Sequence, residues 1–145
     1  MDQTPEQVLS KSLVAENKLN KLIDEVKYKN NLVAQKIVIG GFSQGCMISL
    51  QTGIKRKDTI NSIVGYSGRI IDTEHLGKNI VSKPNVILMH GDIDQIVPVN
   101  SLLEARDFFN KNNYKIESEI FKNCEHRIPT EGSSLGLQFI KKHLL

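Results

Sequence analysis

The chain has 145 residues, enough for a single hydrophobic core, and we expect residues 1–145 to form one domain. Its net charge of +3, with both signs interspersed, is too small to indicate a nucleic-acid partner. The sequence contains neither an apolar run of membrane-spanning length nor a signal peptide, and its 2 cysteines are too few for a disulfide framework. These features predict a cytoplasmic globular protein.

The first predicted element is an amphipathic helix over residues 5–29. Thr4 is typical of an N-cap, a proline follows at the first helical position, and Gln7 is placed to complete a capping box. Apolar side chains then recur at helical spacing until two asparagines interrupt the pattern at residues 30–31.

Short apolar runs then alternate with amphipathic segments along the rest of the chain. The predicted strands are residues 36–42, 62–66, 85–89 and 114–121, and the predicted helices are residues 44–54, 99–112 and 132–144. The β-branched run at 36–42 is typical of a strand that is buried on both faces. This alternation predicts an α/β fold, in which helices cover both faces of a mostly parallel sheet. Catalytic groups gather at the carboxyl ends of the strands in such folds.

The segment Gly41-Phe42-Ser43-Gln44-Gly45 joins the second predicted element to the helix that follows it. This G-x-S-x-G pattern places the serine at the tip of a strained strand-to-helix turn, where the glycines let the two backbones pass closely. The backbone N–H of Gln44 would then be an oxyanion donor. Phosphate-binding interpretations fail, because Cys46 stands where a P-loop requires lysine and no register fits the dinucleotide fingerprint.

A nucleophilic serine requires a histidine base and a carboxylate that orients it. Asp92 and Asp94 follow the third predicted strand and His126 follows the fourth, in the chain order of an α/β-hydrolase. Ser43 could instead cap its helix, and Asp94 could be an ordinary loop residue, with Asp92 as the fallback for the acid. His90 and the two aspartates could form a metal cluster, but no other spacing supports one, so we expect no metal.

Three motifs together resemble one known family. The segments GGFSQG at 40–45, YSG at 66–68 and HGDIDQIVP at 90–98 are similar to those of the carboxylesterase, phospholipase and acyl-protein thioesterase branch of the α/β-hydrolases. The resemblance extends from the first helix to Leu145. It implies a hydrolase that cleaves an ester or thioester substrate, such as an acylated protein or lipid, through an acyl-enzyme and without a cofactor.

The resemblance also implies a role for each residue of the site. Ser43 would be the nucleophile, Asp94 the triad acid and His126 the base, while Gln44 would supply an oxyanion N–H. Asp92 would be a structural residue of its loop and the fallback for the acid. Cys46 occupies a position where the family has glycine, a change between small residues that we expect to be tolerated.

The resemblance further implies a truncated α/β-hydrolase fold, the C-terminal two-thirds of the usual one. The early strands and the loop that donates the second oxyanion N–H are expected to be absent, which would impair activity. A non-catalytic remnant, or one half of a split hydrolase, is the alternative. The strand at 36–42 would then be an exposed edge, through which we expect self-association or binding of an N-terminal fragment.

Overall fold

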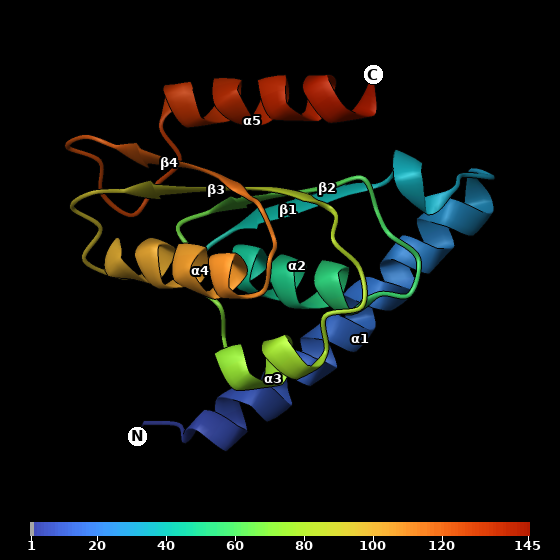
Figure 1. Ribbon diagram of the computed structural model, residues 1–145, viewed down its shortest axis with the longest axis horizontal. Helices are drawn as coiled ribbons and strands as arrows, with labels where there is room; N and C mark the ends of the chain where they lie inside the picture. Colours follow the sequence, from blue (N-terminus) through green and yellow to red (C-terminus); the bar gives the residue numbers. More distant parts are fainter. Residues whose placement is uncertain (1) are drawn as a thin grey trace.

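The computed structural model describes residues 2–145 and contains one four-stranded parallel sheet (Figure 1). Its strands follow one another in the order β1-β2-β3-β4, and each neighbouring pair is parallel. Their bounds are β1 (Val38–Phe42), β2 (Ser62–Tyr66), β3 (Asn85–Gly91) and β4 (Glu117–Phe121). The predicted α/β class and parallel sheet are therefore confirmed.

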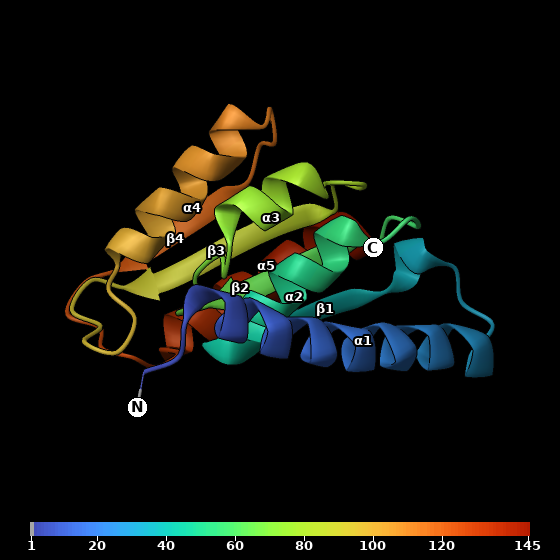
Figure 2. The ribbon, with the colours of Figure 1, turned by 90° about the horizontal axis from the view of Figure 1, so that it is seen from below.

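Helices cover both faces of the sheet, as the alternation of elements predicted. One face is covered by α5, and the other by α2 and α4, while α1 packs on the outer side of α2 (Figures 1 and 2). The helices are α1 (Pro5–Lys29), the 3₁₀-helix η1 (Ala34–Lys36), α2 (Gln44–Lys55), α3 (Thr73–Lys78), α4 (Asn100–Lys111) and α5 (Thr130–Leu144).

Most predicted bounds agree with the structure, and the differences have local causes. The capping box of α1 is formed, since Thr4 Oγ1 accepts from the N–H of Gln7 while the Gln7 side chain accepts from the N–H of Thr4. β1 starts two residues later than predicted because η1 takes up Lys36. β4 starts at Glu117 because Tyr114 belongs to the turn before it. The six-residue helix α3 was not predicted.

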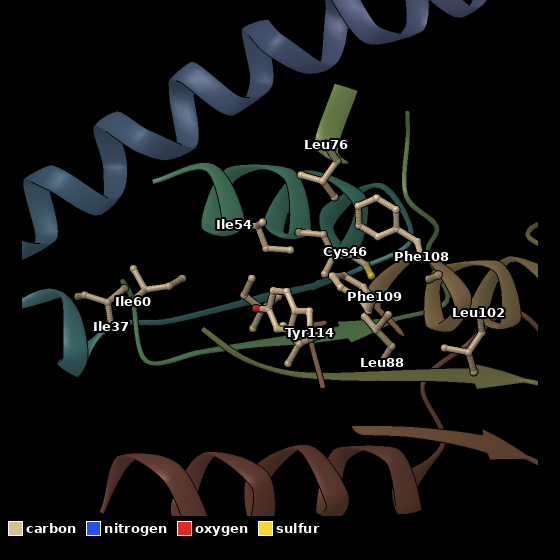
Figure 3. Packing of buried hydrophobic residues seen from close by; sticks show 14 of the residues in the cluster. Ile37, Cys46, Ile54, Ile60, Leu76, Leu88, Leu102, Phe108, Phe109 and Tyr114 are labelled. Atoms are coloured by element: carbon tan, nitrogen blue, oxygen red, sulfur yellow. The ribbon is translucent and has the colours of Figure 1, made fainter. Parts of the chain in front are cut away.

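Two apolar clusters hold the layers together, one on each face of the sheet. Successive residues of a strand point to opposite faces, so Ile63 joins the cluster under α2 and α4 while Val64 joins the cluster under α5. In the larger cluster Ile54 and Phe109 are fully buried, and Figure 3 shows them packed between helices and sheet. Burying side chains of this size contributes about 1.5–3 kcal/mol each.

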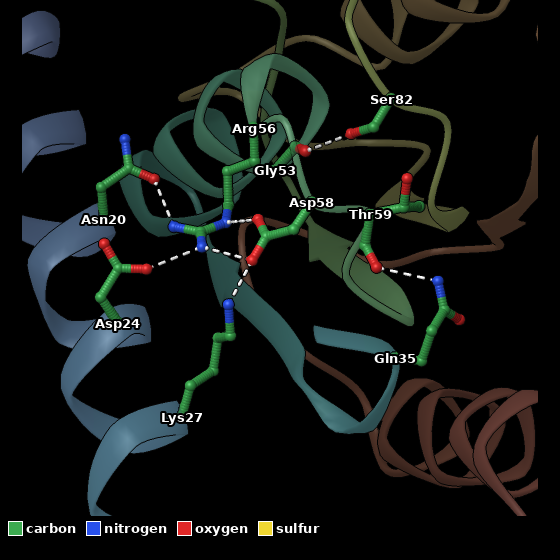
Figure 4. Close-up of polar contacts among 9 residues, drawn as sticks. All are labelled: Asn20, Asp24, Lys27, Gln35, Gly53, Arg56, Asp58, Thr59 and Ser82. Atoms are coloured by element: carbon green, nitrogen blue, oxygen red, sulfur yellow. Dashed lines mark hydrogen bonds and ion pairs between the residues drawn. The ribbon is translucent and has the colours of Figure 1, made fainter. Parts of the chain in front are cut away.

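A polar network fixes α1 against the chain that leaves α2 (Figure 4). The Arg56 guanidinium, whose side chain is 8% exposed, donates to Asn20 Oδ1, Asp24 Oδ1 and both carboxylate oxygens of Asp58. Lys27 also donates to Asp58. The hydrogen bond from Arg56 and the one from Lys27 outweigh the effect of burial and lower the pKa of Asp58 from 3.8 to about 2.

The lowered pKa predicts how the Asp58 carboxylate contributes to stability as pH changes. Since the folded pKa lies below the unfolded one, the contribution is complete above pH 3.8 and is lost as pH falls towards 2. Asp58→Asn should lower the free energy of unfolding by about 1 kcal/mol at neutral pH, a modest value because the side chain is partly exposed. Urea titrations at several pH values should show this difference disappearing in acid. Asp107→Asn, which removes an exposed carboxylate on α4, should show no such pattern.

The strand β1 forms one edge of the sheet, and it is only partly buried, which corrects the expectation of burial on both faces. The carbonyl of Ile37 accepts from the N–H of Asn61, and the N–H of Ser43 donates to Tyr66. Backbone groups of alternate residues point to opposite sides, so those of Val38, Gly40 and Phe42 face the open edge. Gly40 is exposed, and β1 contains no charge or proline that would protect it.

We propose that the open edge of β1 pairs with a further strand, from a second copy of the chain or from an N-terminal fragment. Light scattering on the purified chain should then show association. Val38→Pro should weaken it because it removes one N–H donor of the open edge and leaves the bonds to β2 in place. Val38→Ala is the matched control, since it loses the side chain and keeps the N–H. A monodisperse monomer would contradict the proposal.

Candidate active site

The turn between β1 and α2 places Ser43 in a backbone conformation that side chains rarely adopt. Its φ is 57° and its ψ is −115°. The N–H of Ser43 donates to Tyr66 O (2.8 Å) and its carbonyl accepts from the N–H of Met47 (3.1 Å), so both sides of the turn are fixed. Ser43 stands at the N-cap position, but its hydroxyl makes no capping hydrogen bond. The hydroxyl is therefore available for another partner.

Close approach of two backbones makes this turn possible. A Cβ on Gly41 would lie 2.5 Å from the carbonyl carbon of Gly45, so only glycine fits at position 41. A Cβ on Gly45 itself would meet no heavy atom within 4 Å. The G-x-S-x-G pattern predicts that both glycines are needed for the strand and helix backbones to pass closely. The structure requires the absence of a side chain at Gly41 but not at Gly45.

His126 lies between Ser43 and Asp94, although the three residues come from separate loops. Its Nε2 lies 3.1 Å from Ser43 Oγ and its Nδ1 lies 2.7 Å from Asp94 Oδ2. The three loops follow β1, β3 and β4, so they meet at the carboxyl edge of the sheet. The structure thus brings together the three side chains that the sequence had suggested for the triad.

Asp94 is held in place from both sides by hydrogen bonds. Its Oδ1 accepts from the N–H groups of Ile96 (2.9 Å) and Val97 (2.8 Å), and its side chain is 0% exposed. Burial raises the pKa of Asp94, but the hydrogen bonds from His126, Val97 and Ile96 outweigh it and hold the pKa below its ordinary value. The carboxylate is therefore ionised at neutral pH, and Oδ2 can accept from a protonated Nδ1 of His126.

The remaining polar residues of these loops join the loops to one another. Asp92 Oδ1 accepts from the N–H of Cys124 (3.1 Å), which ties the loop after β3 to the loop that carries His126. His90 Nε2 lies 2.7 Å from Val97 O, and the histidine is 2% exposed. Asp92 and His90 thus support the loops and do not reach Ser43 in this arrangement.

Gln44 lies at the start of α2, beside Ser43. The first N–H groups of a helix have no partner within it, and the first helical bond of α2 is made by Met47. Cys46, in the same turn, is 2% exposed, and its sulfur packs over Gly65 and Gly68. Burial raises the pKa of the Cys46 thiol to about 12, so this cysteine remains protonated and packs as a small apolar residue.

One contact of the site was not predicted from the sequence. The Phe42 ring lies 4.6 Å from the His126 ring, measured between centroids, and Phe42 is 38% exposed. Its position directly before Ser43 was the only signal that could have indicated this contact.

Within residues 2–145, no group of three or more His, Cys, Asp or Glu side chains is arranged to hold a metal ion. None of the helices in this range combines the length and the apolar character that a membrane span requires.

A parallel sheet with a strand-to-helix elbow, and with a serine, a histidine and an aspartate meeting at its carboxyl edge, defines an α/β-hydrolase fold. The family model described as Phospholipase/Carboxylesterase matches residues 3–144. The chain belongs to this family.

Relatives of the chain include the acyl-protein thioesterase 1 of Saccharomyces cerevisiae. The two are 32% identical in an alignment 140 residues long, and the alignment covers 88% of this chain and 60% of the yeast protein. The acyl-protein thioesterase 1 of Yarrowia lipolytica is 35% identical in an alignment 120 residues long, which covers 77% of this chain and 51% of the Yarrowia protein. The chain thus spans about half to three-fifths of the length of these relatives.

Solved structures share the fold. The crystal structure of esterase PE8 superposes with a TM-score of 0.92 at 27% identity, covering 99% of this chain and 66% of the esterase chain. The crystal structure of Arabidopsis thaliana SOBER1 gives a TM-score of 0.87 at 19% identity, covering 99% of this chain and 68% of the other, and shows a common fold.

The steric difference between the two elbow glycines predicts unequal effects of the same substitution. Gly41→Ala should lower the free energy of unfolding by about 1–3 kcal/mol, because its Cβ overlaps the backbone of Gly45. Gly45→Ala should leave stability unchanged or raise it, since alanine is favoured over glycine in a helix. Chemical denaturation of both variants measures the difference. Equal losses would show that the close approach does not depend on position 41.

Proposed function

We propose that the chain is a serine hydrolase in which Ser43, His126 and Asp94 form the catalytic triad. The observation that carries the proposal is the pair of distances at His126, 3.1 Å to Ser43 Oγ and 2.7 Å to Asp94 Oδ2. The strained φ of Ser43 supports it further, because backbone strain of this kind is typical of functional sites.

The proposed reaction begins with the transfer of a proton. His126 Nδ1–H donates to Asp94, so Nε2 carries the lone pair that accepts the proton of the Ser43 hydroxyl. Ser43 Oγ attacks the carbonyl carbon, and the imidazolium of His126 then gives its proton to the departing alcohol or thiol. A water molecule, deprotonated by the same Nε2, then attacks the acyl-enzyme. The acid is released as the imidazolium returns its proton to Ser43 Oγ. Asp94 stabilises the imidazolium throughout.

The negative charge that develops on the carbonyl oxygen needs hydrogen-bond donors. In our proposal the N–H of Gln44 supplies one, since it follows the nucleophile at the first turn of α2. The positive end of the α2 dipole acts in the same direction.

The substrate class follows from the chemistry and from the names of the relatives. A triad of this kind attacks activated acyl carbons, and proteins similar to this chain are named acyl-protein thioesterases and an esterase. We therefore propose a carboxylic ester or an acyl thioester, carried by a protein or a lipid, as the substrate. We further propose that residues 1–145 act as one domain. The meeting of three side chains from separate loops favours this function over a non-catalytic remnant.

Covalent labelling tests the proposed nucleophile. A fluorophosphonate probe should modify the wild-type chain at Ser43, and Ser43→Ala should abolish the signal. His126→Ala should reduce the labelling rate by about a hundredfold or more, because the base activates the hydroxyl. The labelled residue is identified by mass spectrometry of peptides.

The two aspartates provide a matched pair for the acid. Asp94→Asn should slow labelling more than Asp92→Asn, since only Asp94 contacts His126. Labelling that persists in Ser43→Ala would remove Ser43 from the proposed role, and the opposite order of the aspartate variants would assign the acid to Asp92.

A further inference from the structure

A groove of about 540 Å³ lies between α1 and α2 and reaches the start of α2 beside Ser43. Apolar side chains from both helices and from the segment after β2 line it, among them Val8, Met47, Ile48 and Ile71. Gln44, the residue proposed to donate to the oxyanion, also lines it. The groove therefore extends to the residue that directly follows Ser43 in the chain.

The charged residues of this groove are of one sign. Lys11 on α1 and Arg69 after β2 are the ionisable side chains among its lining residues, and none of the lining residues is acidic. The acidic residue nearest to Arg69 in the chain, Asp72, accepts a hydrogen bond from the N–H of His75 at the start of α3. Apolar walls with two cations suit an amphipathic ligand that carries a negative charge.

The chain positions Arg69 through a second strained turn. Ser67, directly after β2, has a φ of 55°, is 1% exposed, and donates its N–H to Met89 O (2.8 Å). A Cβ at the next residue, Gly68, would lie 3.2 Å from Ser43 O, so the turn passes directly beside the elbow. A serine held in the left-handed region is strained, and such strain occurs mostly at functional sites.

The guanidinium of Arg69 is oriented by carbonyls of its own loop. Its Nη1 donates to Ile70 O (3.3 Å) and Ile71 O (3.2 Å), which leaves Nε and Nη2 as donors for a ligand. A guanidinium held in this way binds phosphate or carboxylate oxygens better than a flexible ammonium does.

We propose that this groove binds the anionic part of the substrate, with Arg69 as the main contact and Lys11 as a secondary contact. The apolar walls of the groove would contact the apolar part of the same substrate molecule. This inference rests on the proposed function and narrows it, because it selects esters or thioesters that carry a phosphate or carboxylate. Arg69 is thus a residue for specificity and takes no part in the transfer of protons.

Calorimetry with ligands that cannot be hydrolysed tests the groove apart from the chemistry. Octyl phosphate should bind the wild-type chain at least tenfold more tightly than octanol, and added salt should weaken only the binding of the phosphate. Arg69→Gln should reduce the affinity for octyl phosphate by about tenfold, and Lys11→Gln by about two- to threefold because this lysine is exposed. Comparison with octanoate shows which of the two anions is preferred.

Three controls keep the result clear. Lys141 belongs to α5, which covers the opposite face of the sheet, so Lys141→Gln removes one positive charge and should not change the affinity. Arg69→Lys keeps the charge but loses the fixed guanidinium, so it should bind octyl phosphate less tightly than wild type and more tightly than Arg69→Gln. This variant serves as a check if Arg69→Gln unfolds in circular-dichroism melts. Octyl phosphate should also protect Ser43 from the fluorophosphonate.

The outcomes separate this inference from the proposed hydrolase. If Ser43 is labelled while octyl phosphate binds no better than octanol, or while Arg69→Gln binds it as well as wild type, the inference is overturned and the hydrolase stands. If octyl phosphate binds through Arg69 but Ser43 is never labelled, the hydrolase fails, and with it the assignment of the groove to a substrate.

Discussion

The close passage of two backbones at the elbow is the constraint on which the candidate site depends. Gly41 must come within van der Waals contact of Gly45 for the chain to reverse from β1 into α2. The reversal leaves Ser43 at positive φ, a conformation that costs about 1–3 kcal/mol and has to be offset by neighbouring interactions. Those interactions are the burial of Leu50 and Ile54 on α2 and the hydrogen bond from Ser43 N–H to Tyr66. The core thus maintains the strain at the site.

The geometry beyond the elbow depends on contacts between residues that are distant in the sequence. Ser43 and His126 are 83 positions apart, and His126 and Asp94 are 32 apart. Each is carried by a loop at the same edge of the sheet, so the register of β1 to β4 sets their separation. The hydrogen bond from Cys124 to Asp92 fixes two of these loops to each other. The candidate site therefore assembles only when the whole sheet is formed.

Much of this architecture could be predicted because the responsible signals are local. The capping box at Thr4, the apolar strands and the glycines around Ser43 each act within a few residues. The order of motifs along the chain then suggested which side chains would meet. Signals of tertiary origin were missed. The late start of β4 depends on Tyr114, whose hydroxyl donates to the carbonyl of Pro84 in a distant loop. Likewise, no sequence pattern shows that Arg69 and Lys11 line one groove.

The two edges of the sheet differ in chemistry. Strand β4 carries the exposed carboxylates of Glu117 and Glu119, and Lys142 of α5 pairs with Glu117, so another strand would meet charge there. Strand β1 has no such protection. A sheet that can extend at one edge only cannot grow by repeated addition of copies. In the proposed association, pairing of two β1 edges about a twofold axis would use up both open edges, so assembly through this strand would stop at two chains and would not continue into a fibre.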